Sequence, residues 1–172
     1  METLVEALWF FLPGFIANQC PGLMAKLNTP LRIPVSERWL GRNKTWDSYC
    51  VGACGGIATI YFQRLFPAID RDLALIDYMR DDLAIVGILM GVGAILGDHI
   101  KSFFKRQMGI RPGESWWPFD QLDFVAGGLI VVTPYAGWIG WERTVLLAAI
   151  MLLVHPVGNW LGYKAGLRKV PW

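Results

Sequence analysis

Residues Gly97 to Asp123 read GDHIKSFFKRQMGIRPGESWWPFDQLD, and the rest of the chain is organised around this stretch. It begins near the end of a strongly apolar run and then becomes densely polar. The polar residues that follow one another here are Asp98, Lys101, Ser102, Lys105 and Arg106. At about 100° per residue, Asp98, Ser102 and Lys105 fall within one narrow sector of a helix face, and the other two flank that sector.

A loop rich in Gly, Pro and Trp comes next, followed by Asp120 and Asp123, which share a face if a helix has begun there. Carboxylates on both sides of a cation cluster suit a metal-bound polyphosphate, because hard oxygens bind Mg²⁺ and cationic side chains bind phosphate. The plainer alternative is a juxtamembrane loop whose charges lie in water. We favour the site, because the charges begin inside a hydrophobic segment, where charge is costly and usually functional.

The composition indicates an integral membrane protein. The chain has 172 residues, 54% of them hydrophobic, and a mean hydropathy of +0.38, which exceeds the apolar share usual in soluble domains. The first residues are acidic, with Glu2 and Glu6, so we expect no cleavable signal peptide. The net charge of +2 says little about partners, and we expect no nucleic-acid partner.

Five segments are each near the length of about 20 residues that a bilayer core of about 30 Å requires. They lie near Val5–Leu27, Ser48–Phe66, Leu83–Phe103, Phe124–Trp141 and Thr144–Tyr163. Pro13 and Pro21 lie within the first of them and predict a kinked or broken helix there. The sequence therefore predicts an all-α integral membrane protein with five transmembrane helices, forming a single domain over residues 1–172.

The positive residues predict the orientation of these spans. If the N-terminus is outside, twelve of the sixteen Lys and Arg residues lie on the inner side. The positive-inside rule then gives a cytoplasmic C-terminus and two basic cytoplasmic loops, one over Asn28–Asp47 and one after the third span. We therefore predict a multi-pass protein of the cell membrane whose polar stretch faces the cytoplasm.

The first of these loops carries the string Gly41-Arg42-Asn43-Lys44-Thr45. Such a string can offer backbone N–H groups, an ammonium and a hydroxyl to phosphate, although it lacks the glycine spacing of a P-loop. A solvated basic loop explains the string at least as well when it is taken alone. It gains weight because it shares a membrane face with the Asp98–Asp123 stretch.

Several uncharged polar residues fall inside the predicted spans. Asn18 and Gln19 lie in the first, and His155 and Asn159 lie in the last. A buried amide usually forms an interhelical hydrogen bond, and the alternative is a role beside a polar lipid headgroup. For Asn18 and Gln19 the two interpretations are balanced, and for the last span we favour packing.

The order of these motifs resembles the signature of the cytidylyltransferases that make CDP-activated lipids. The motifs are Gly97-Asp98, Ser102, Lys105-Arg106 and Asp120-x-x-Asp123. Within that group the chain is more similar to the CDP-archaeol synthase family of small five-span proteins. The further motifs that carry this resemblance are Pro13 with Ala17-Asn18 and Pro21, Asn43-Lys44-Thr45, and Pro118-Phe119-Asp120-Gln121-Leu122-Asp123-Phe124. They reach from the first span to the fourth.

The resemblance implies a Mg²⁺-dependent transfer of CMP from CTP to a membrane lipid phosphate, giving a CDP-lipid and pyrophosphate in phospholipid biosynthesis. In the archaeal enzymes the acceptor is 2,3-bis-O-geranylgeranylglyceryl phosphate. The catalytic residues that the resemblance implies are Asp98, Asp120, Asp123 and Lys105, and the three aspartates would also hold the metal. The residues expected to bind CTP are Asn43, Lys44, Thr45, Ser102, Lys105 and Arg106. The oligomeric state is not predicted.

The chain departs from the family where Asp47-Ser48 replaces the usual Arg-Gly after Lys44-Thr45-Trp46, which removes a possible phosphate contact. One alternative enzyme is a CDP-diacylglycerol synthase acting on phosphatidate. An alternative of another class is a small, non-enzymatic membrane assembly protein whose charged loops bind a partner. A transporter is disfavoured, because it would be expected to have charges in several spans or an inverted repeat, and the sequence shows neither.

Overall fold

The computed structural model describes residues 2–24, 32–66, 73–79 and 82–166, and these contain five α-helices. The helices are α1 (Glu2–Met24), α2 (Asp47–Gln63), α4 (Leu83–Gln107), α5 (Phe119–Ala136) and α6 (Trp141–Lys164). No β-strand occurs in the described part of the chain, where the one β-type pairing is an isolated bridge between Pro34 and Thr45. The predicted all-α architecture is therefore confirmed.

The bounds of the helices correct the predicted spans in two places. The helix α5 begins at Phe119 instead of near Phe124, so Asp120 and Asp123 lie in its first two turns. It ends at Ala136, and Trp141 opens α6 instead of closing the fourth span. The break follows from Gly137 and Gly140, whose φ angles of 89° and 87° favour glycine and end a right-handed helix. Leu27, the predicted end of the first span, lies outside the described residues.

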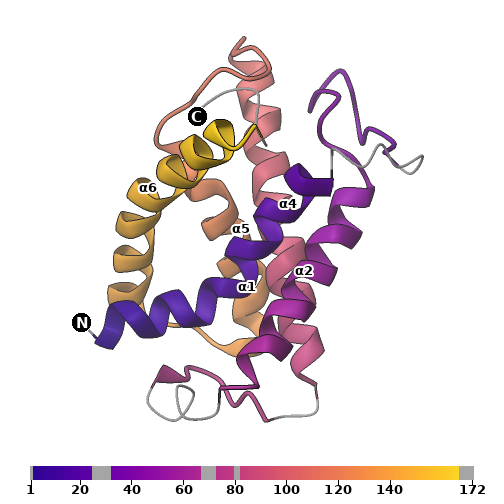
Figure 1. Ribbon diagram of the computed structural model, residues 1–172. Helices are drawn as coiled ribbons and strands as arrows, with labels where there is room; N and C mark the ends of the chain where they lie inside the picture. Colours follow the sequence, from indigo (N-terminus) through magenta and orange to yellow (C-terminus); the bar gives the residue numbers. More distant parts are fainter. Residues whose placement is uncertain (1, 25–31, 67–72, 80–81, 167–172) are drawn as a thin grey trace.

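Two of the helices, α4 and α6, are long and apolar enough to cross a membrane by length and composition. In the described ranges no other helix meets that test, so the arrangement with five membrane spans stays a prediction. The helix α1 continues through Pro13 and Pro21 and visibly bends along its course, as its prolines predict (Figure 1).

The helix α4 packs closely against α2 and α5 because glycines face each other across both interfaces. A Cβ atom added at Gly56 of α2 would lie 2.1 Å from the carbonyl oxygen of Gly87 on α4. A Cβ added at Gly97 of α4 would lie 2.1 Å from the carbonyl oxygen of Asp123 on α5. Small residues permit such close packing of helices in lipid. The contact at Gly97 brings Asp98 next to the aspartates of α5.

The segments that connect the helices lie at the two ends of the helix bundle. The segment before α2 and the loop between α4 and α5 project from one end of the bundle, where α6 also finishes (Figure 1). The connections before α4 and between α5 and α6 lie at the opposite end. The two basic loops therefore share one end, as predicted. That this end faces the cytoplasm stays a prediction.

Polar contacts between helices hold the opposite end together. Arg143 of α6 forms an ion pair with Glu6 of α1, with 2.7 Å between Nη2 and Oε2. The side-chain amide of Gln63 at the end of α2 donates to the carbonyl oxygen of Trp9 at 2.6 Å. These contacts tie α1 to α6 and to α2 far from the polar stretch.

Candidate active site

Lys101 of α4 lies at the centre of a cluster of three carboxylates. Its Nζ is 3.2 Å from Asp98, one turn earlier on α4, and 2.7 Å and 2.9 Å from Asp120 and Asp123 of α5. The Asp123 side chain is 4% exposed and that of Lys101 is 13% exposed, so the contacts are largely shielded from solvent. The sequence placed Lys101 only at the flank of the polar face, but in the structure it joins all three aspartates.

Lys105, one turn further along α4, fixes the loop that leads into α5. Its Nζ lies 3.0 Å from the Asp120 carboxylate and donates to the carbonyl oxygen of Glu114 at 2.6 Å. The backbone N–H of Trp116 donates to Asp120 at 2.6 Å. Asp120 thus joins two lysines of α4 to the loop backbone, which sets the position where α5 begins.

Lys44 reaches the cluster from the segment before α2 and forms an ion pair with Asp98. This segment is held in a hairpin-like arrangement, since the N–H of Val35 donates to the carbonyl oxygen of Lys44 at 2.8 Å. The N–H of Trp46 likewise donates to Ile33 at 2.9 Å, on the other side of the bridge at Thr45. The structure therefore joins the two basic loops at one site, as their shared membrane face suggested.

His99 connects the start of α2 to α4 and is a residue that the sequence did not assign. Its Nδ1 lies 2.8 Å from the Tyr49 hydroxyl, and its Nε2 lies 3.4 Å from the Ser48 hydroxyl. Ser48 also donates to the carbonyl oxygen of Thr45, next to Lys44. Ser48 stands where the family usually has glycine, so this departure is part of the contact that positions the Lys44 segment. The sequence could have indicated a structural role for His99, because the face of α4 beside Asp98 must pack against another helix.

The other predicted site residues have different positions. Ser102 is buried on α4, one turn from Asp98, and Thr45 is buried beneath its segment. Asn43 is exposed and lines an open cavity of about 580 Å³ between the two loops, together with Arg38, Arg42 and Pro112. Among the described residues, Asn43 and Arg106 make no ion pair or side-chain hydrogen bond with the aspartates.

The cluster can be tested for its fit to a divalent cation. As the side chains stand, the described residues contain no group of three acidic, His or Cys side chains arranged around a vacant metal position. The three carboxylates instead surround the ammonium group of Lys101, which is the cation at their common centre. Carboxylate oxygens are the preferred ligands of Mg²⁺, so the three side chains have the donor chemistry for that ion, and Lys101 occupies their common centre in this structure.

The family is decided by the whole sequence together with this fold. The family described as "CarS-like: CDP-archaeol synthase" matches residues 1–172, the full length of the chain. The chain belongs to this family. The resemblance that the motifs carried, and the phospholipid-synthesis enzyme class that goes with it, are thereby confirmed.

Two relatives named CDP-archaeol synthase align over nearly the whole chain. A protein of Methanospirillum hungatei with the name CDP-archaeol synthase is 36% identical over 172 residues, covering 94% of this chain and 99% of its own length. A Methanococcus aeolicus protein of the same name is 28% identical, covering 98% of this chain and 97% of its own.

A solved structure of an intramembrane enzyme for archaeal membrane lipid biosynthesis has the same fold, with a TM-score of 0.72. It is 29% identical, and the match covers 91% of this chain and 94% of that one. The match supports a membrane protein, in agreement with the long apolar helices α4 and α6.

Proposed function

We propose that this protein transfers CMP from CTP to 2,3-bis-O-geranylgeranylglyceryl phosphate, giving a CDP-lipid and pyrophosphate. The observation that carries the proposal is the cluster of three lysines and three aspartates contributed by the segment before α2 and by α4 and α5. Ionisable groups at membrane depth usually serve function, and this cluster has the mixture of charges that a metal-bound nucleotide requires.

The reaction needs no covalent intermediate with the protein. An oxygen of the lipid phosphate attacks the α-phosphorus of CTP, a new P–O bond forms, and the bond to the β-phosphate oxygen breaks. The leaving group carries its electron pair away as pyrophosphate. Because the acceptor is already an anion, the protein has to bring two polyanions together and stabilise the charge that develops between them.

The lysines supply the positive charge for the nucleotide. Lys44 and Lys105 reach the cluster from different elements, so together they can contact the β- and γ-phosphates from two sides. Ser102 follows Lys101 and Thr45 follows Lys44 in the sequence, so both hydroxyls would add neutral hydrogen bonds to the phosphates. Asn43, which lines the cavity between the loops, would contact the outer part of CTP, and the buried Nε of Arg106, which has no hydrogen-bond partner among the described residues, could donate to a phosphate oxygen.

Asp98, Asp120 and Asp123 would hold a Mg²⁺ ion, because their carboxylates already converge on one cation. When bound, such an ion neutralises phosphate charge and orients the triphosphate. Release of Lys101 from the aspartates would free its ammonium group to contact phosphate. The aspartates therefore have two partners in turn, the lysine in the free protein and the cation in the complex.

The site lies where a water-soluble nucleotide and a membrane lipid can both reach it. It includes the end of α4 that carries Lys105 and the first turns of α5, next to the two loops. We propose that this end faces the cytoplasm in the cell membrane, as the distribution of Lys and Arg predicts. CTP would approach from the loops while the lipid tails remain in the bilayer.

The test is pyrophosphate release by the detergent-purified protein given CTP, Mg²⁺ and a lipid phosphate. We expect release with the isoprenoid ether lipid phosphate and none when ATP replaces CTP. Release with phosphatidate in its place would identify a CDP-diacylglycerol synthase. No release with either lipid, together with no CTP binding, would favour the assembly-protein alternative.

A matched pair of variants tests the cluster. Asp123→Asn should abolish turnover because it removes a buried carboxylate that faces Lys101 and the proposed cation. Glu142→Gln, which removes an acidic residue from the first turn of α6, should leave turnover near the wild-type rate. Turnover close to wild type in a folded Asp123→Asn protein would remove that residue from the mechanism.

A further inference from the structure

The helix α5 is polar on two faces where it begins. Asp120 and Asp123 face α4 and its lysines. Gln121 belongs to a different, buried face, which continues with Phe124, Gly128 and Val132. This second face packs against α1, since the Phe124 ring centroid lies 5.9 Å from that of Phe11 and a Cβ added at Gly128 would meet Phe11 at 2.8 Å.

Asn159 of α6 points toward the same region. It ends the buried stripe of that helix, which consists of Leu147, Met151, His155 and Asn159. The His155 ring lies 5.3 Å from Phe124. Gln121 is three residues before Phe124, Asn159 is four residues after His155, and α5 and α6 run in opposite directions (Figure 1). Both amides therefore lie about one turn closer to the loop-bearing end than the Phe124–His155 contact.

Neither of these amides is fully satisfied by the protein. Gln121 is 4% exposed and Asn159 is 3% exposed. Within the described residues, Gln121 Oε1 and Asn159 Oδ1 are buried and have no hydrogen-bond partner. Leaving a buried amide unpaired costs stability, so two such groups at one level indicate that another molecule completes their hydrogen bonds.

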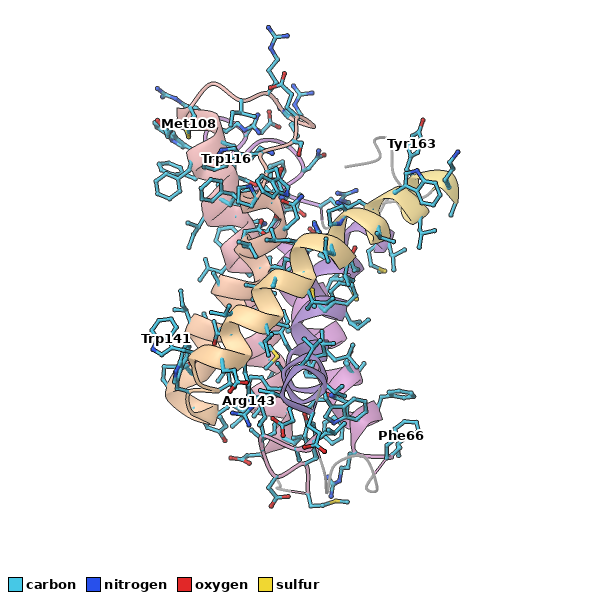
Figure 2. All side chains as sticks on the ribbon, turned by 90° about the vertical axis from the view of Figure 1, so that its left-hand side faces the viewer. Phe66, Met108, Trp116, Trp141, Arg143 and Tyr163 are labelled. Atoms are coloured by element: carbon cyan, nitrogen blue, oxygen red, sulfur yellow. The ribbon has the colours of Figure 1, made fainter. Side chains whose placement is uncertain are left out.

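This region lies on a different face of α5 from the charged cluster and beside the exposed apolar side of α6. The outward side of α6 is apolar and exposed at Leu153, Val157, Trp160 and Leu161. Toward its end at Tyr163, α6 diverges from the part of the bundle that carries Met108 and Trp116 (Figure 2). The amides thus lie between a lipid-facing helix and the face of α5 opposite the nucleotide site.

We propose that Gln121 and Asn159 bind the glycerol oxygens of the lipid acceptor, which enters between α6 and the α1–α5 pair. This inference rests on the proposed function. Ether and ester oxygens accept hydrogen bonds but do not donate them, and a half-turn of each amide presents N–H donors at the positions now held by oxygen. Uncharged donors suit the part of a lipid between its phosphate and its hydrocarbon chains, while the phosphate extends past α5 toward the lysines.

The experiment compares two lipids on the full-length protein in detergent. One is the glyceryl diether phosphate, and the other is the monophosphate of a single isoprenoid alcohol, which has no glycerol oxygens and is assayed as a competitor. Gln121→Met and Asn159→Leu remove the amides while keeping similar volumes. We expect each to raise the KM for the diether phosphate about fivefold, the effect of one lost hydrogen bond. The inhibition constant of the monophosphate and the KM for CTP should stay unchanged.

Thermal stability gives a second, independent measurement. Because the two amide oxygens are buried and unpaired within the described residues, each substitution should leave the Tm unchanged or raise it. Leu153→Ala on the exposed side of α6 is the control and should alter none of the kinetic constants. A lowered Tm with an unchanged KM for the diether would show that the amides only pack, and would overturn the inference.

The other outcomes are equally distinct. An equal rise in the KM for the diether and in the inhibition constant of the monophosphate would mean a general distortion, and would also overturn the inference. If the wild-type protein releases pyrophosphate and the two variants keep the wild-type constants for both lipids, the proposed function stands and the proposed lipid site is overturned. Wild-type protein that is inactive with every lipid phosphate would overturn both.

Discussion

The close approach of α4 to α5 at Gly97 should be required for activity. In Gly97→Ala the new Cβ would lie 2.1 Å from the carbonyl oxygen of Asp123. An ordinary contact needs about 3.4 Å, so the helices must separate locally by roughly 1.3 Å. That carbonyl belongs to the residue whose carboxylate contacts Lys101, and Asp98 is the next residue along α4. The displacement therefore falls on the cluster itself.

The expected size of the effect follows from this geometry. Overpacking of this kind costs about 1–3 kcal/mol of folding stability. A misplacement of about 1 Å between reacting groups can lower the rate by about 100-fold. We therefore expect Gly97→Ala to lower kcat/KM for CTP by about 100-fold and to lower the Tm measurably, while circular dichroism still shows a helical protein.

The chain offers a matched control for this substitution. Gly158 also lies within a helix, α6, and a Cβ added there would meet nothing within 4 Å. Gly158→Ala should leave kcat/KM unchanged and stabilise the helix by up to about 1 kcal/mol, the usual difference in helix propensity. Wild-type kcat/KM in Gly97→Ala would refute the claim that this glycine contact sets the geometry of the site.

Two further predictions concern the contacts around Asp98. In Lys101→Met the three carboxylates lose the ammonium group that they share, so Mg²⁺ should raise the Tm more in this variant than in the wild type. The control is Lys164→Met, which changes an exposed lysine of α6. Equal Mg²⁺-induced shifts in all three proteins would contradict the claim that Lys101 occupies the position of the metal ion. Ser48→Ala and His99→Ala should each raise the KM for CTP. In the double variant the effects of the two substitutions should be coupled by about 0.5–1.5 kcal/mol, because each removes one partner of the same contact. Additive effects would mean that the Ser48–His99 contact does not position Lys44.

The sequence predicted the composition of the site better than its geometry. Apolar segment lengths predicted five helices, and the spacing of the charged residues identified three aspartates that meet at Lys101 and a lysine, Lys105, that contacts Asp120. Helical periodicity could not place Lys101 at the centre. Its position depends on where α5 begins and on how closely Gly97 lets that helix approach, and neither distance is a property of α4 alone.

His99 and Gln121 illustrate the same limit on neighbouring positions. Each lies next to an aspartate of the cluster but about 100° around its helix, so each faces a different neighbour. His99 contacts α2, and Gln121 lies on the buried face of α5 that packs against α1 through Phe124. The sequence gives the angle between adjacent side chains, but the identity of the helix on that side comes only from the packing.

The balance of charge at the site explains why the free protein can hold so many ionisable groups near the membrane. Three lysines and three aspartates pair with one another, so the buried cluster carries no net charge and each group has a partner. A nucleotide triphosphate arriving with a divalent cation brings partners of both signs. In the proposed mechanism the carboxylates would pass from ammonium to metal, and the ammonium groups would pass from carboxylate to phosphate. In the proposed complex each of the six groups would exchange one partner of opposite charge for another, so none of the six would be left as an unpaired charge in an apolar region.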